Sequence, residues 1–158
     1  MARTFSSDDV DEELLVALQR LGRLMASRQV SSTIAGAAGV ELTQQGVQLL
    51  RTLHRAGELP IAGLAVTSQM DIAAVSRQLR TLESSGLVAR STSPNDGRVV
   101  LVSLTDAGTA VAARIREVGL QHLVASLAGW SERERRQVAS LLSRLVNDLQ
   151  HTEIPRAD

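Results

Sequence analysis

The hydrophobic pattern of residues 61–104 changes its period once, and this change limits the folds open to the chain. Before Gly86, apolar residues recur every three or four positions, which is typical of helices. After it come two β-rich runs, 87–92 and 99–104, separated by the turn formers of residues 93–97. The pattern therefore predicts a short helix, a second helix and then a β-hairpin.

The helices before the hairpin have recognisable ends. We predict N-caps at Thr43 and Asp71, a helix stop at Gly57, and Pro60 at the first position of a short helix. Two apolar stripes are predicted, one made of Val47, Leu50, Leu53 and His54, the other of Ile72, Val75, Leu79 and Leu82.

Longer helices are predicted on both sides of this middle segment. One covers about residues 8–30, and the small, Gly-rich residues 31–40 can bend or break it. A further helix is capped by Thr105 and Asp106, and the last begins at a capping box of Ser131 and Glu134. Both ends of the chain carry Leu-rich stripes, so we expect them to pack against a second copy as well as their own chain.

Composition excludes several classes of function. The 158 residues contain no Cys and no Lys, which excludes thiol chemistry, zinc–thiolate sites and Schiff-base lysines. Net charge is zero, and Phe5 and Trp130 are the only aromatic residues, so a stacking platform for single strands is not expected. The sequence shows neither a signal peptide nor a long apolar run, and we expect a soluble, cytoplasmic protein.

The predicted layout is mainly α with a small β-hairpin, the arrangement of a winged helix-turn-helix. In such folds the second helix enters the major groove of DNA. Its outer face is predicted to carry Ala73, Ala74, Ser76, Arg77 and Arg80. Arg77 is suited to a guanine edge, Ser76 to a phosphate or a base, and either alanine to a thymine methyl group. The alternative is a surface helix with two solvated arginines.

The hairpin adds three candidates for DNA binding. Arg98 follows the tight tip and can enter a minor groove, while Arg90 can meet a phosphate. Asp96 is predicted to hold Arg98 through an ion pair. The alternative is a strand edge protected by charge. Residues 71–98 have a net charge of only +1, which predicts modest non-specific affinity and a shallow salt dependence.

The segment DIAAVSRQLRTLESSGLVAR, followed by PNDGRVVLVSLTDAG, resembles the multiple antibiotic resistance regulator (MarR) family. The matching positions are Val75, Ser76, Arg77, Leu82, Glu83, Gly86, Leu87, Val88, Arg90, Asp96, Gly97, Arg98, Leu104, Thr105 and Gly108. The resemblance implies one domain over residues 1–158, with dimerisation helices at about 8–32 and 109–150 and a DNA-binding lobe at about 43–108. It also implies a homodimeric repressor on a pseudo-palindromic operator, released by a small aromatic or lipophilic anion.

One position departs from the family pattern. Members often have a Leu-Gly pair in the turn before the recognition helix, where this chain has Thr67-Ser68-Gln69-Met70. Gly adopts positive φ freely, whereas Gln69 pays a conformational penalty, so the turn can be longer or differently shaped. The effector pocket is expected among the first, second and fifth predicted helices. Scarce aromatics favour an aliphatic lining, with an Arg to meet a carboxylate.

Other functions have weaker support. His54, His122 and His151 lack the spacing of a metal site, and we predict neither a metal nor a cofactor. Trp130 is interpreted as a packing residue at a helix junction, with the lining of an effector pocket as the alternative. No catalytic motif is found, so an enzyme is not expected. A winged-helix adaptor that binds proteins instead of DNA stays open as the second function.

Overall fold

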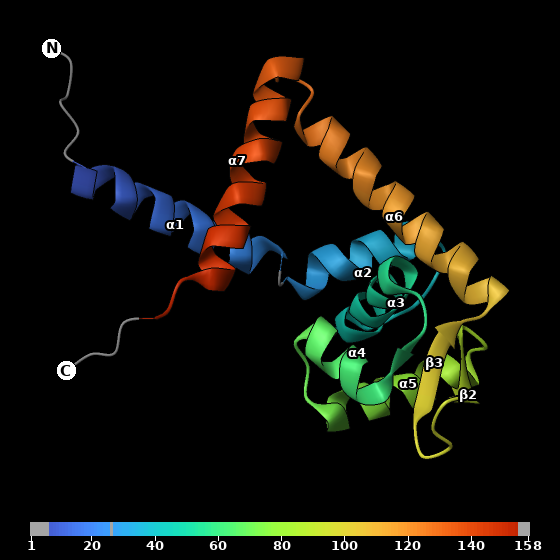
Figure 1. Ribbon diagram of the computed structural model, residues 1–158. Coiled ribbons are helices and arrows are strands. Elements are labelled where there is room, and N and C mark those ends of the chain that lie inside the picture. The colour runs from blue at the N-terminus through green and yellow to red at the C-terminus, as the bar shows by residue number, and fades with distance from the viewer. Residues whose placement is uncertain (1–6, 26, 155–158) are drawn as a thin grey trace, which may run out of the picture. The chain divides into compact units, whose positions relative to one another are not determined.

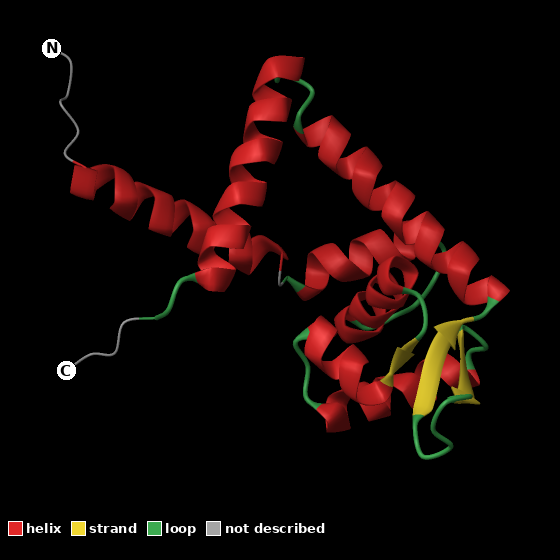
Figure 2. Cartoon of the chain, in the orientation of Figure 1, coloured by secondary structure: helices red, strands yellow, loops and turns green. Residues whose placement is uncertain are grey.

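A computed structural model describes residues 7–25 and 27–154, which form seven helices and a three-stranded sheet (Figures 1 and 2). This confirms the mainly helical fold with a small β element. The chain divides into two compact units, one ending at Gly119 and the other beginning at Leu120. The elements are α1 (Ser7–Met25), α2 (Arg28–Ala37), α3 (Gln44–Ala56), β1 (Leu59–Pro60), α4 (Ile61–Ser68), α5 (Ile72–Ser84), β2 (Val88–Thr92), β3 (Val100–Leu104), α6 (Asp106–Ser126) and α7 (Glu132–His151).

Helix α3 is central to the core of the first unit, since it packs against α2, α4, α5 and β3. Val47, Leu50 and Leu53 of the predicted stripe are buried, whereas its fourth member, His54, is exposed. Leu49, which the predicted stripe did not include, is buried as well. Each buried leucine contributes about 1.5–3 kcal/mol to folding. The other large side chains buried with them are Leu64, Val75, Leu79, Leu82, Val102 and Ile115.

Two predicted N-caps of the first unit are confirmed. The Thr43 hydroxyl accepts a hydrogen bond from the Gly46 amide at 3.0 Å, and the Asp71 carboxylate accepts one from the Ala74 amide at 2.7 Å. A cap of this kind contributes about 1 kcal/mol. Asp71 therefore fixes the point at which α5 begins.

In the second unit, the predicted capping box at the start of α7 is also confirmed. The Ser131 hydroxyl accepts from the Glu134 amide at 3.3 Å, and the Glu134 carboxylate accepts from the Ser131 amide at 2.7 Å. Hydrogen bonds from the Ser131 side chain and backbone lower the pKa of Glu134. The charged carboxylate is thus the form that holds the helix start.

The hairpin is confirmed, and the sheet has one strand more than predicted. Strand β3 pairs antiparallel with β2, from Val88 opposite Leu104 to Thr92 opposite Val100, and its other edge pairs with β1. Pro60 was expected inside the next helix, but it ends β1 and precedes α4. A two-residue strand shows no alternation in sequence, and an edge strand tolerates a proline.

The N-terminal helix differs from the prediction. It ends at Met25, Ser27 is extended (φ −68°, ψ 124°), and α2 starts at Arg28. The small residues after position 30 continue α2 instead of breaking it. Ala35 is buried, so small side chains let α2 approach the core closely. The helix stops only before Gly39, whose φ is +75°.

Helices α1 and α7 expose large apolar side chains. On α7 no residue is buried, although the sequence places a leucine-rich stripe there. Monomeric proteins rarely leave such faces open to water. The exposed residues are Val10, Leu14, Leu15, Val16, Leu21, Leu24 and Met25 on α1, and Leu141, Leu142, Val146 and Leu149 on α7.

Gly108 is required by close packing at the start of α6. A Cβ atom at this position would lie 1.8 Å from the Leu87 carbonyl oxygen, and backbone atoms cannot move aside as a flexible side chain can. We expect Gly108→Ala to destabilise the protein by about 3 kcal/mol or more, since it forces the backbone apart. Urea denaturation followed by circular dichroism measures the change.

Gly36→Ala is the matched control. Gly36 lies in α2, and a Cβ atom added there would have no neighbouring atom within 4 Å, so alanine should stabilise the helix by about 0.5–1 kcal/mol. Equal free energies of unfolding for the two variants would contradict the packing described at Gly108.

Candidate nucleic-acid interface

Helices α4 and α5 form a helix-turn-helix in which α5 presents a polar face. Ala73, Arg77 and Arg80 are exposed on it, and Ser76 is half-buried. The spacing of Ala73, Arg77 and Arg80 places them on one side of the helix. Four of the five residues predicted for the outer face of α5 are therefore accessible at least in part.

The fifth residue, Ala74, was placed wrongly. Its side chain is 3% exposed, whereas Ile72, predicted to be in the core, is 57% exposed. Helix α5 packs against both α3 and α4, so its buried face is wider than one stripe and includes Ala74. Ile72 is the first residue of α5 and lies beyond that packed region. Sequence analysis thus missed Ile72 as an accessible apolar residue at the N-terminal end of α5.

The turn between α4 and α5 contains a strained residue. Gln69 has φ 54° and ψ 41°, and it is the only non-glycine residue with positive φ in the described ranges. The amide of Gln69 donates to the Val66 carbonyl at 3.1 Å, and that of Met70 to the Ala65 carbonyl at 3.0 Å. These bonds close the end of α4 in the usual way. Gln69 thus has the positive φ that glycine adopts freely, and the turn from α4 to α5 consists of residues 69–71.

Gln78 joins α5 to the start of α3, a role that sequence analysis did not identify. The Thr43 hydroxyl donates to the Gln78 side-chain carbonyl at 2.7 Å. The Gln78 amide group donates to the Gln45 side chain at 3.2 Å. A polar residue on the flank of an amphipathic helix gives no signal of such a contact. It fixes α5 against the helix that carries most of the core.

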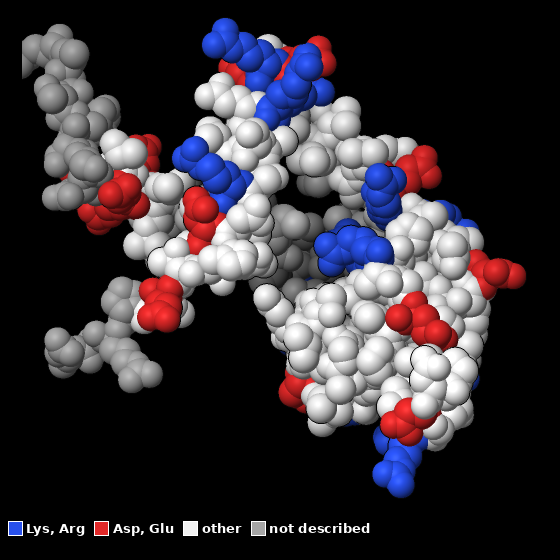
Figure 3. Space-filling model, in the orientation of Figure 1, with Lys and Arg blue, Asp and Glu red and all other residues white. Residues whose placement is uncertain are grey.

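At the hairpin tip, the Asp96 carboxylate contacts the backbone of Arg98 and not its guanidinium group. Its carboxylate accepts a hydrogen bond from the Arg98 amide at 2.9 Å. The expected ion pair is not formed among the described residues, because the carboxylate caps the tight turn instead. Arg98 is exposed, and Figure 3 shows acidic and basic side chains side by side near this end of the hairpin.

Arg90 lies on β2 and forms an ion pair with Glu83 of α5, with 3.1 Å between Nε and Oε2. The Arg90 side chain is 31% exposed and that of Glu83 is 45% exposed. An exposed pair of this kind contributes at most about 1 kcal/mol. It links the wing to α5 and still leaves part of the guanidinium open to solvent.

The three acidic residues between positions 71 and 98 are all engaged in local contacts. Asp71 caps α5, Glu83 pairs with Arg90, and Asp96 holds the hairpin tip. Arg77 and Arg98 therefore have no acidic partner in the described part of the chain, and neither does Arg80. The net charge of +1 understates the positive potential that the outward arginines present.

Comparisons with known proteins agree with this geometry. The MarR family model matches residues 42–100. The HTH-type transcriptional regulator YdgJ of Bacillus subtilis (strain 168) is 30% identical over 150 residues, covering 95% of this chain and 86% of that protein. The chain belongs to the MarR family. A putative transcriptional regulatory protein for the hcr operon of Thauera aromatica is 31% identical over 136 residues, covering 86% of this chain and 80% of that protein.

Solved structures support the fold of this MarR-family chain. A MarR family protein from Bacillus stearothermophilus superposes with a TM-score of 0.79 at 20% identity, covering 92% of this chain and 99% of that one. This likeness shows the winged-helix fold, and membership of the MarR family together with the HTH-type relatives shows that the protein is a DNA-binding transcriptional regulator. Within the described ranges no group of three acidic or histidine side chains could hold a metal ion. No helix there is both long and apolar enough to cross a membrane.

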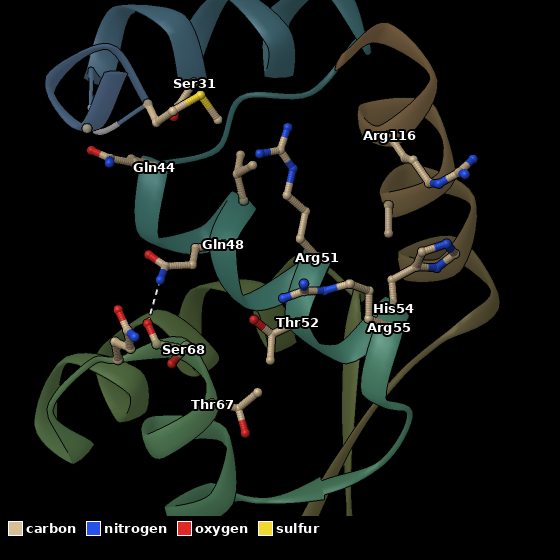
Figure 4. Close-up of a pocket in the computed structure, with 15 residues that line it drawn as sticks. Ser31, Gln44, Gln48, Arg51, Thr52, His54, Arg55, Thr67, Ser68 and Arg116 are labelled. Atoms are coloured by element: carbon tan, nitrogen blue, oxygen red, sulfur yellow. Dashed lines mark hydrogen bonds between the residues drawn. The ribbon is translucent and has the colours of Figure 1, made fainter. Parts of the chain in front are cut away.

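A cavity of about 790 Å³ lies in the first unit, beside the turn that precedes α5. It is lined mainly by α3, with further residues from α1, α2, the end of α4 and α6. Figure 4 shows Arg51 and Arg55 extending from α3 into this space, with Thr67 and Ser68 on the side of α4. The Gln48 amide group donates a hydrogen bond to the Ser68 carbonyl. The cavity lies among the three helices where sequence analysis expected an effector pocket.

The lining of this cavity combines apolar side chains, such as Met25 and Val47, with polar ones that include three arginines. Helix α3 turns Gln44, Gln48, Arg51 and Arg55 toward the cavity, at spacings of four, three and four residues. That is one helical stripe, so the signal was present in the sequence. The apolar stripe of the same helix, which fills the core, gives the stronger periodic signal. The charged side chains of the lining are all cationic.

The strain at Gln69 can be relieved by substitution. We expect Gln69→Gly to stabilise the protein by up to about 1 kcal/mol, because glycine adopts positive φ without the penalty of about 1–2 kcal/mol. The gain is reduced by the extra entropy of glycine in the unfolded chain. Urea denaturation measures it. Gln69→Ala is the control and should give no gain, since alanine keeps the unfavourable φ; a stabilised alanine variant would contradict the backbone explanation.

Proposed function

We propose that the protein is a homodimeric repressor that binds a pseudo-palindromic operator and is released by a small anionic effector. The observation that carries this proposal is the set of outward arginines without acidic partners on α5 and the wing tip. In a helix-turn-helix these are the positions that face DNA.

In this proposal α5 enters the major groove with its N-terminal half. Arg77 reads a guanine edge and Arg80 contacts a phosphate. Ser76, half-buried, donates to a phosphate or a base, and Ala73 allows close approach of the helix. Ile72, exposed at the first position of the helix, is added here as a contact for a thymine methyl group.

The β2–β3 hairpin reaches the flanking DNA. Arg98 enters the adjacent minor groove, where narrow A·T segments attract arginine. Asp96 shapes the tip for this contact by holding the Arg98 amide. Arg90 contacts a phosphate with its exposed edge while Glu83 fixes its position. Ala74 has no direct role in DNA binding, since its side chain is buried.

The exposed apolar faces of α1 and α7 support the homodimer. Each face would be covered by the second copy, and the two units of the chain would then act as one MarR-type regulator over residues 1–158. Two recognition helices held about 34–36 Å apart meet successive major grooves on one side of the duplex. An effector that favours a different spacing releases the DNA by population shift.

A protein-binding adaptor is the alternative, and mutation of the arginines separates the two functions. We expect Arg77→Ala to weaken specific operator binding by about 5- to 150-fold, because a bidentate guanine contact contributes about 1–3 kcal/mol. Arg98→Ala should weaken it as well and reduce the salt dependence. Fluorescence anisotropy measures the affinity of both variants for the DNA upstream of the protein's own gene, with a scrambled duplex for comparison.

Arg133→Ala is the control for these variants, because it removes the same charge from an exposed position in α7. Its affinity for DNA should stay within about twofold of the wild type, because Arg133 is not part of the proposed reading face and salt screens exposed charges. If no genomic fragment is bound better than the scrambled duplex, the adaptor is favoured. If Arg77→Ala binds the operator like the wild type, the assigned reading face is wrong.

The dimer has its own test. We expect Val146→Asp to shift the protein toward monomers, because it places a charge in the apolar face of α7. Light scattering coupled to size-exclusion chromatography measures the mass at several concentrations. Ser140→Asp, on the opposite side of the same helix, should stay dimeric. A wild-type protein that is monomeric at all concentrations would refute the proposed assembly.

A further inference from the structure

The cavity beside the α4–α5 turn has a charge pattern that restricts its ligand. Three arginines line it: Arg51 and Arg55 from α3, and Arg116 from α6. None of the 15 lining residues is Asp or Glu. None of the three guanidinium groups forms an ion pair or hydrogen bond within the described ranges. The cavity is therefore a concentrated positive site with no counter-charge of its own.

Arg51 is in the least favourable position of the three. Its side chain is partly buried, and a methyl group at Gly119 of α6 would lie only 3.5 Å from its Nη2 atom. Arg55 follows it at the i,i+4 position, where like charges repel. Burial, and secondly the charge of Arg55, lower the pKa of Arg51. Since partly buried charges are normally paired, an anion here would remove a penalty that the free protein carries.

Beside the apolar Met25, Val47 and Ala112, the rest of the lining includes several polar side chains. Gln44, Gln48, Thr52, Thr67 and Ser31 contribute amide and hydroxyl groups, and the residues in the cavity include no aromatic ring apart from His54. Figure 4 shows these groups around the guanidinium groups of Arg51 and Arg55. A lipophilic ligand would leave the guanidinium groups of the cavity without partners, which is costly. A ligand with several oxygens can satisfy them.

We propose that this cavity binds a polar anion carrying two or more carboxylate or phosphate groups, held by Arg51, Arg55 and Arg116. Guanidinium groups suit such oxygens because they donate two parallel hydrogen bonds. This differs from the aromatic or lipophilic anion that the family resemblance implied.

The position of the cavity connects the ligand to DNA reading. Thr67 and Ser68, the last residues of α4, line it together with Gln69, the first residue of the turn that precedes α5. The hydrogen bond from Gln48 to the Ser68 carbonyl joins the cavity stripe of α3 to this turn. A ligand seated on Arg51 and Arg55 therefore biases the turn that sets the position of the recognition helix. This regulatory step rests on the proposed function, but binding of the anion does not.

Isothermal titration calorimetry of the full chain without DNA tests the binding itself. The probes are inorganic pyrophosphate, citrate and the aromatic monoanion benzoate, at about 0.15 M salt to screen weak surface binding. We expect pyrophosphate or citrate to bind at one site per chain and about tenfold or more tighter than benzoate. The preferred probe then shows whether phosphate or carboxylate oxygens are recognised.

Arg51→Gln and Arg55→Gln should each weaken binding of the preferred probe by about tenfold or more, given the strength of charged hydrogen bonds. Arg98→Gln is the matched control, because it removes the same charge from the exposed wing tip and should bind the probe like the wild type. Arg55 is exposed, so its variant stays informative if Arg51→Gln fails to fold. Melting temperatures by circular dichroism check the fold of each.

Three results would overturn the proposal: no binding of either polyanion, tighter binding of benzoate, or unchanged binding in both cavity variants. DNA affinity is measured in parallel. If the cavity variants lose operator binding as Arg98→Gln does and bind the probes like wild type, the arginines contact DNA instead. If the polyanion binds but never changes DNA affinity, the cavity site stands and effector release by it is refuted.

Discussion

The structure depends on the close contact between the end of the recognition helix and the start of α6. There the Thr105 hydroxyl donates to the Gly86 carbonyl at 2.7 Å and accepts from the Gly108 amide at 3.0 Å. The Thr105 amide donates to the Leu87 carbonyl at 3.1 Å, against which Gly108 packs with no room for a side chain. One junction thus fixes the end of α5, both strands of the wing and the first turn of α6. A shift of the first turn of α6 would therefore strain its contacts with the end of α5 and the start of the hairpin, because this packing leaves no free space.

Helix α3 also has two roles in the first unit, because one of its faces packs in the core and another lines the cavity. Its apolar face fills the core with Leu49, Leu50 and Leu53, which fixes its position against α5. Its polar stripe lines the cavity and reaches the α4–α5 turn through Gln48. A rigid helix that contacts both a ligand cavity and the α4–α5 helix-turn-helix is the kind of element through which two sites can be coupled. The positive φ of Gln69 lies at the same turn, and backbone strain of this kind is often found at functional sites.

Local rules predicted most of the fold because each acts over a few residues. The caps at Thr43, Asp71 and Ser131 need only one side chain and an amide three positions on. Tertiary packing decided the rest. Strand β1 is two residues long and exists only because β3 has a free edge. The exchange of Ala74 and Ile72 between core and surface follows from two neighbouring helices that α5 contacts at once, and no single-helix pattern contains that information.

Both candidate sites use the same residue type, arginine. The degree of burial of each arginine determines which kind of anion it suits. The chain uses arginine for every basic position, so charge type alone cannot assign a role. At the wing, Arg98 is exposed and screened, which suits a phosphate backbone that is itself surrounded by counterions. In the cavity, Arg51 is partly removed from water beside a second cation, so its interaction with an anion is screened less and depends more on geometry. Exposed arginines therefore favour affinity for a long polyanion, whereas the cavity arginines favour selection of a small one.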